Sequence, residues 1–274
     1  ADSRFNVPPI VTGLVVSAIS FVIIVGGISR IGSITEKLVP AMTIIYISGC
    51  LYVIIANYDM IIPSLFTIIK SAWGFDSAVG GFSGMALAKT ISIGFQRGLS
   101  SNEAGLGTAP LIYASSEVES ALKQGMWSIF QVFFDTIVIC TLTAFTILTS
   151  GAYNKMLASS IKSFEPYKLV ENSFKSVMSD DIASFLLSIC IILFSFTTII
   201  GWCCCGEKAI EYVFSSRSIP VFRVLYVLFT IAGAVTSPEL AWVIASNLNG
   251  LMALPNILGI ITLSDVVKNT ATDD

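Results

Sequence analysis

The chain has 274 residues, of which 54% are apolar and 12% charged, with a net charge of −3 and a mean hydropathy of +0.83. A soluble domain carries about 25% charged residues, so this composition excludes a soluble globular protein and indicates an integral membrane protein. The absence of His excludes His-based catalysis and His-liganded zinc. The lack of a basic patch excludes nucleic acid as a partner.

Apolar stretches in chain order predict seven membrane-spanning helices, because a helix needs about 20 apolar residues to cross the hydrocarbon layer. The alternation typical of a β-barrel is missing, so we expect a single all-α transmembrane domain over residues 1–274. The predicted spans are 8–28, 38–57, 79 to about 98, 125–149, 182–205, 220–235 and 240–267.

Two connections between these spans are distinctive. Residues 57–76 contain an apolar piece, 61–73, that is too short to cross and predicts an external re-entrant or interfacial helix. Residues 150–182 are polar and predict the longest extracellular loop. The distribution of Lys and Arg places the N-terminus of the chain outside and its C-terminus in the cytoplasm.

The start of the chain bears on its extent. It begins with Ala, and its first residues lack a signal-peptide pattern. A helix that enters the membrane from outside needs a preceding segment. We therefore expect the chain to be the C-terminal part of a longer protein, with the missing N-terminal half of that protein as its partner in the lipid bilayer.

The stretch RGLSSNEAGLGTAP, residues 97–110, places polar and flexible residues directly after an apolar stretch. Gly weakens a helix interior by about 1 kcal/mol relative to Ala, and glycines are dense here. The pattern predicts a helix interrupted between about Gly98 and Gly105, with a new helix starting near Glu103. Unwound backbone at membrane depth is tolerated where it lines a cavity, as in transporter sites. The alternative is a plain cytoplasmic loop.

Polar residues inside the spans are further candidates. Asp135 would cost about 3 kcal/mol if it faced lipid, so it must face protein, either in a structural polar contact or as an ion or proton relay. Glu103 is expected to bond backbone at the break or to pair with Arg97. Thr197 and Thr198 lie mid-span, with Trp202 one turn after Thr198. The alternative for these threonines is a bond to their own helix.

Five ordered motifs resemble the alanine or glycine:cation symporter family of sodium-coupled amino-acid carriers. RGLSSNEAGLGTAP is similar to that family's Arg-Gly-(Leu/Met)-Phe-Ser-Asn-Glu-Ala-Gly signature. The other four are GGISRIGSITEKLVP (26–40), QGMWSIFQVFFDTIVICTLTA (124–144), FTTIIGWCCCGEKAIEYVF (196–214) and NGLMALPN (249–256).

The resemblance implies a leucine-transporter-like fold of two inverted repeats, from which the first three core helices are missing here. It implies no enzyme activity but sodium-coupled symport of a small neutral amino acid, alanine or glycine, across the plasma membrane, with Na⁺ as coupling ion. The implied site residues are Ser100, Ser101, Asn102, Gly105, Thr198 and Trp202 for substrate, and Thr197 and Thr198 for sodium. From their own chemistry, Glu103 and Asp135 are expected to be structural polar groups.

Ser100 stands where the family usually has Phe, so the expected side-chain pocket is larger or more polar and specificity for alanine or glycine is open. Two other functions remain as alternatives. One is a channel or a structural membrane subunit. The other is an intramembrane hydrolase, for which Asp135 lacks an obvious second Asp at comparable depth.

Overall fold

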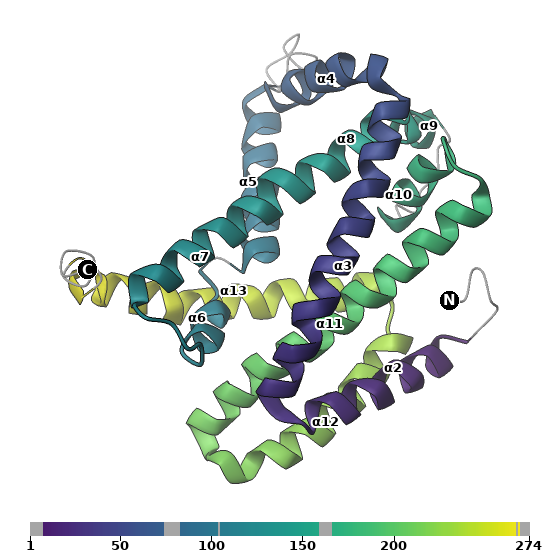
Figure 1. Ribbon diagram of the computed structural model, residues 1–274. Coiled ribbons are helices and arrows are strands. Elements are labelled where there is room, and N and C mark those ends of the chain that lie inside the picture. Colours follow the sequence, from purple (N-terminus) through teal and green to yellow (C-terminus); the bar gives the residue numbers. More distant parts are fainter. Residues whose placement is uncertain (1–7, 74–82, 104, 159–165, 267, 269–274) are drawn as a thin grey trace. The chain divides into compact units, whose positions relative to one another are not determined.

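The structure is a computed structural model that describes residues 8–73, 83–103, 105–158, 166–266 and 268. Every regular element among these residues is helical (Figure 1). The chain divides into two compact units. Unit 1 comprises Ala1–Met42, Glu103–Ser128 and Ile191–Asp274, and unit 2 comprises Thr43–Asn102 and Ile129–Cys190.

The helices follow one another with short connections. In the first half of the chain they are α2 (Pro9–Ile24), α3 (Gly27–Ala56), η1 (Tyr58–Met60), α4 (Ile61–Trp73), α5 (Ser83–Asn102) and α6 (Thr108–Tyr113). In the second half they are α7 (Ala121–Phe133), η3 (Phe134–Cys140), α8 (Thr141–Thr149), α9 (Ala152–Ala158), α10 (Pro166–Lys175), α11 (Asp180–Phe214), η4 (Ser216–Ser218), α12 (Ile219–Val235) and α13 (Pro238–Thr262).

Five helical stretches in the described ranges are long and apolar enough to cross a membrane: Gly27–Ala56, Ala121–Thr149, Asp180–Phe214, Ser216–Val235 and Pro238–Thr262. The predicted count of seven is therefore not confirmed. Helix α2 is apolar but only 16 residues long, because Gly27 adopts a left-handed backbone with φ of 75°.

The predicted span that starts at residue 79 is not among the five. Residues 79–82 lie outside the described residues, as do the last three residues of the 57–76 connection and the end of the 240–267 span. The part that is described, α5, carries Lys89, Arg97 and several hydroxyl groups. These polar groups lower its hydropathy.

Two predicted boundaries are wrong. Helix α3 begins at Gly27 and not at residue 38, because Ile31, Ile34 and Leu38 recur at helical spacing and turn inward. The polar residues around Arg30 have low hydropathy, which predicted a loop. Arg30 lies on the exposed face of that helix. Helix α11 continues past residue 205 to Phe214.

The extension of α11 has an electrostatic cause in unit 1. The Glu207 carboxylate accepts hydrogen bonds from Nε and Nη2 of Arg223 on α12, at 2.6 and 3.0 Å. The remaining guanidinium nitrogen, Nη1, donates to the carbonyl of Val25 at 3.4 Å. A bidentate pair of this kind compensates a charge that would otherwise end an apolar helix.

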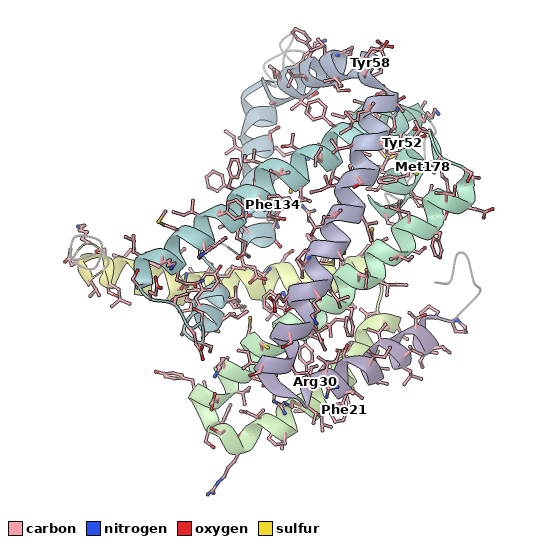
Figure 2. The ribbon with its side chains drawn as sticks, in the orientation of Figure 1. Phe21, Arg30, Tyr52, Tyr58, Phe134 and Met178 are labelled. Atoms are coloured by element: carbon pink, nitrogen blue, oxygen red, sulfur yellow. The ribbon has the colours of Figure 1, made fainter. Side chains whose placement is uncertain are left out.

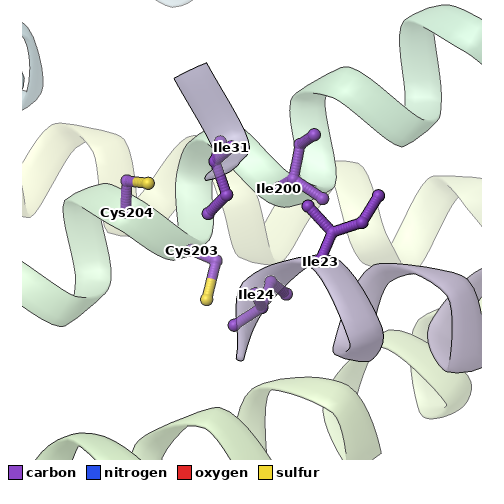
Figure 3. Close-up of a cluster of buried hydrophobic side chains, with 6 residues drawn as sticks. All are labelled: Ile23, Ile24, Ile31, Ile200, Cys203 and Cys204. Carbon is purple, nitrogen blue, oxygen red and sulfur yellow. The ribbon is translucent and has the colours of Figure 1, made fainter. Parts of the chain in front are cut away.

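Unit 1 is also held by apolar packing. A buried cluster joins Ile23 and Ile24 of α2, Ile31 of α3, and Ile200, Cys203 and Cys204 of α11 (Figure 3). Helix α2 lies along α12 (Figure 1). A Cβ added to Gly13 would lie only 2.6 Å from Cβ of Ala234. Small residues at such a crossing let two membrane helices approach closely.

Unit 2 packs around the expected 150–182 connection, which contains the two short helices α9 and α10. Phe174 of α10 is fully buried with Cys50 and Val53 of α3 and with Leu187 of α11. Tyr46 of α3 and Thr143 of α8 share a hydrogen bond of 2.8 Å. The predicted helix over 61–73 is confirmed as α4, whereas its re-entrant or interfacial position stays a prediction.

Large apolar side chains project from the outer faces of the helices. Phe21, Tyr52 and Tyr58 are exposed examples (Figure 2). A soluble protein rarely exposes large contiguous apolar areas. This exposure fits helices that face lipid.

Candidate functional site

A break separates α5 from the next helix, and the structure describes it at residues 103 and 105–107. Helix α5 ends at Asn102, and the backbone is left-handed at Glu103, Gly105 and Gly107, with φ of 52°, 79° and 83°. One turn is closed by a bond from the Leu106 amide to the Glu103 carbonyl, at 3.2 Å. The predicted interruption is present, but it begins after Asn102 and not at Gly98.

Helix α5 continues past Gly98 for a local reason. The Asn102 side-chain amide donates to the carbonyl of Gly98 at 3.1 Å, within the last turn of the helix. A single Gly in a helix costs only about 1 kcal/mol, so glycine density alone did not locate the break. The residues with left-handed backbone, Glu103, Gly105 and Gly107, mark the position of the break.

The helix that follows the break is short and starts later than expected. Helix α6 begins at Thr108 and not near Glu103, and it has six residues. Its N-cap is Gly107, which offers no side-chain cap. Instead, the buried Thr108 hydroxyl donates to the Glu103 carboxylate at 2.5 Å. The partner of Glu103 is thus a side chain across the break rather than neighbouring backbone.

Ser101 lies at the end of α5 and bonds to Asp135. The Ser101 hydroxyl donates to Oδ2 of Asp135 at 2.7 Å. Asp135 is half-buried in η3, a π-helical turn between α7 and α8. Turns of this kind are frequent at functional sites because they disrupt the regular bonding of a helix.

Asn102 makes a parallel contact one residue further on. The Thr136 hydroxyl of η3 donates to Oδ1 of Asn102 at 2.8 Å. Both pairs therefore join two adjacent residues at the end of α5 to two adjacent residues of η3. Ser100, on the same turn of α5, is half-buried.

Thr197, Thr198 and Trp202 all lie on α11. The Thr197 hydroxyl is buried and donates to the carbonyls of Leu193 and Phe194, at 3.0 and 3.1 Å. It also lies 3.9 Å from Sδ of Met42. The Thr198 hydroxyl is exposed and donates to the Phe194 carbonyl at 2.7 Å. Both threonines thus bond their own helix, as the alternative interpretation holds.

The predicted site residues belong to both units. Unit 2 contains Ser100, Ser101, Asn102 and Asp135, which lie together at the junction of α5 and η3. Unit 1 contains Glu103, Gly105, Thr197, Thr198 and Trp202. Their roles in binding substrate and sodium stay predictions.

Sequence reasoning missed Thr136 and Thr108. Thr136 directly follows Asp135 within the 124–144 motif, so the signal was its position beside an intramembrane acid. Thr108 lies five residues after Glu103 and becomes its partner only because the left-handed turns fold the chain back.

Comparison with known proteins covers nearly the whole chain. The sequence profile described as "Sodium:alanine symporter family" matches residues 1–273. The chain is 36% identical over 265 residues to the "Sodium/alanine symporter AgcS" of Methanococcus maripaludis, covering 97% of this chain and 56% of that protein. It is 36% identical over 273 residues to the "Probable sodium/glutamine symporter GlnT" of Bacillus subtilis, covering 99% and 55%.

An "Uncharacterized transporter" of Haemophilus influenzae is 32% identical over 274 residues, covering 99% of this chain and 58% of that protein. The chain therefore spans a little over half the length of these curated relatives. Membership in a symporter family indicates a transporter and not an enzyme. The match over residues 1–273 shows that the chain belongs to the sodium:alanine symporter family.

Proposed function

We propose that the protein couples sodium entry to the uptake of a small neutral amino acid, alanine or glycine, across the plasma membrane. The observation that carries the proposal is the interrupted helix. The last two residues of α5, Ser101 and Asn102, carry polar side chains beside backbone that is no longer helical. These side chains are tied to a carboxylate and a hydroxyl of an otherwise apolar span.

An amino acid is the class of substrate that this chemistry fits. A zwitterion needs hydrogen-bond acceptors for its ammonium group and donors for its carboxylate. The amide of Asn102 supplies both kinds of group. The backbone at Glu103, Gly105 and Gly107 has left the helix, so its amides and carbonyls are not part of regular helical bonding.

Sodium is the coupling ion that the oxygen atoms favour, because a hard cation takes oxygen ligands. The hydroxyls of Thr197 and Thr198 donate their hydrogens to their own helix. This bonding leaves the oxygen lone pairs available to a cation, so it is compatible with a sodium site.

Asp135 supports the coupling of a cation. It lies in the candidate span Ala121–Thr149 and forms no ion pair with any residue that the structure describes. An ionised carboxylate in a span is costly and calls for compensation. A cation taken up from solution would supply it.

The side chain of the substrate is the less constrained part of the proposal. Relatives with comparable identity are named for alanine and for glutamine. Ser100 is small and half-buried, so we propose a pocket that accepts alanine or glycine and has room for a larger polar side chain. The helices of the described residues and the break after α5 support a leucine-transporter-like fold of inverted repeats. The distribution of Lys and Arg supports a C-terminus in the cytoplasm.

Substitution of Asn102 tests this proposal in the full-length protein. Asn102→Ala should abolish alanine uptake while expression stays near that of the wild type. Asn247→Ala is a matched control, because Asn247 of α13 makes the same bond to a carbonyl four residues earlier, at 3.0 Å. Equal uptake by both variants would rule out Asn102 as a substrate-binding residue.

A further inference from the structure

Thr136 is bonded differently from other threonines in the same helical stretch. The hydroxyls of Thr143, Thr146 and Thr149 each donate to a backbone carbonyl four residues earlier, at 2.7–2.8 Å. This is the usual arrangement for Thr in a membrane helix. The Thr136 hydroxyl instead donates across to Oδ1 of Asn102.

The contacts of Asn102 determine how its amide is turned. The carbonyl of Gly98 can only accept, so the group that bonds it must be the Nδ2 end of the amide. Oδ1 is therefore the atom that faces Thr136, and Thr136 must be the donor. The amide keeps one further N–H and one further lone pair for another molecule.

The neighbouring pair supports this geometry. Ser101 donates to Asp135, so two successive residues of α5 are each bonded to one of two successive residues of η3. A single contact would let the last turn of α5 pivot. Two adjacent contacts restrict that rotation, so the Asn102 amide keeps its direction next to the break at Glu103.

We propose that Thr136 is a positioning residue that orients the Asn102 amide toward the substrate, with Asp135 holding Ser101 beside it. The remaining N–H of Nδ2 donates to the substrate carboxylate, and the remaining lone pair of Oδ1 accepts from the substrate ammonium group. The substrate class is thus an α-amino acid with both groups unmodified. The role of Thr136 rests on the proposed function, because it requires that the end of α5 contacts the substrate.

Calorimetric titration of alanine into the purified full-length protein tests this role. Thr136→Val keeps the shape of the side chain and removes the hydroxyl, so alanine binding should weaken by roughly five- to tenfold, as for the loss of one hydrogen bond. Thr136→Ser restores the donor and should stay within about twofold of the wild type. The thermal midpoint of all three proteins should agree.

Thr230→Val is the control, because the Thr230 hydroxyl donates to the carbonyl of Tyr226 in its own helix, at 2.9 Å. It should leave binding unchanged.

If Thr136→Val does not fold, Thr136→Ala takes its place with the same expected loss. Binding by the Val or Ala variant within twofold of the wild type, or equal loss in the Ser variant, would overturn the role of Thr136. An unchanged affinity for alanine amide, which lacks the carboxylate, would do so too. Failure of the wild type to bind any amino acid would overturn the proposed function, and the role of Thr136 with it.

Discussion

The break after α5 depends on a few residues whose backbone is left-handed. For a residue with a Cβ, as at Glu103, this conformation costs about 1–2 kcal/mol. The hydrogen bond from Thr108 to its carboxylate offsets part of that cost. The two glycines adopt the same conformation without a steric penalty. Residue type therefore favours the break at two positions, Gly105 and Gly107.

Gly107 offers a direct test of this encoding. Gly107→Ala should lower the free energy of unfolding by about 1–2 kcal/mol, because φ is 83° and the new Cβ would lie 2.9 Å from Oδ1 of Asn256. Gly98→Ala is the matched control. Nothing lies within 4 Å of a Cβ at that position, and Ala favours a helix by about 0.5–1 kcal/mol. The thermal midpoint of the full-length protein in detergent should fall in Gly107→Ala and rise in Gly98→Ala. A similar fall in both variants would contradict this explanation.

Substitution of Thr198 distinguishes two roles for its hydroxyl, as a sodium ligand or as a structural group. Thr198→Ala should raise the half-saturation for sodium or substrate by about tenfold or more, since bonds to charged groups contribute about 1.5–3 kcal/mol. Thr198→Ser keeps the oxygen and should be nearly silent. A purely structural hydroxyl is worth about 0.6 kcal/mol, which is less than threefold.

Transport kinetics of the wild type and the two Thr198 variants decide between these roles. Thr262→Ala is the control, because Thr262 is likewise exposed and donates to a carbonyl four residues earlier, at 3.0 Å. A Thr198→Ala protein within threefold of the wild type would remove Thr198 from the site.

At the scale of the helices, hydropathy correctly predicted the bounds of those whose apolar face is continuous. The stretches over α7–α8 and α13 and the short α4 lie close to the predicted ranges. The start of α3 was missed because charged residues cover one face of an amphipathic turn. The end of α11 was missed because Glu207 ended the apolar pattern, whereas Arg223 compensates its charge only in the folded protein.

The candidate site was predictable only in part. Sequence reasoning required Asp135 to contact protein, because lipid could not accept its charge. It did not identify Ser101 as the partner, because the two residues lie 34 positions apart. The π-helical turn of η3 has no periodic signal in a sequence, so the alignment of Thr136 with Asn102 could not be foreseen.

Helix α10 should contribute a pH-dependent stability. Although burial alone would raise the pKa of Glu171, hydrogen bonds from Lys175, Tyr167 and Ser184 lower it below its usual value. Lys175 lies 2.9 Å from the carboxylate. A carboxyl whose pKa is lower in the folded state stabilises the fold above the unfolded value of about 4.3. That contribution is lost as pH falls through the folded value.

Glu171→Gln should therefore lower the thermal midpoint at about pH 6 and make little difference at about pH 3. Glu119→Gln is the control, because the side chain of Glu119 is 85% exposed in its pair with Lys123. An exposed pair contributes about 0–1 kcal/mol. A loss from Glu171→Gln that is equal at both pH values would contradict the role of the carboxylate charge.

At the scale of the whole molecule, the chain combines membership in a symporter family with a helix that breaks beside paired polar side chains. It covers 55–58% of the length of its curated relatives. Transport is therefore a property to be measured on the full-length protein.

Uptake of labelled alanine by proteoliposomes that contain the full-length protein tests the central claim most directly. An inward sodium gradient should drive alanine above its equilibrium level, and collapse of that gradient should release it. The Asn102→Ala protein should take up no more than empty liposomes. Uptake that is the same with and without sodium, uptake driven by a proton gradient alone, or no uptake of any amino acid would contradict sodium-coupled symport.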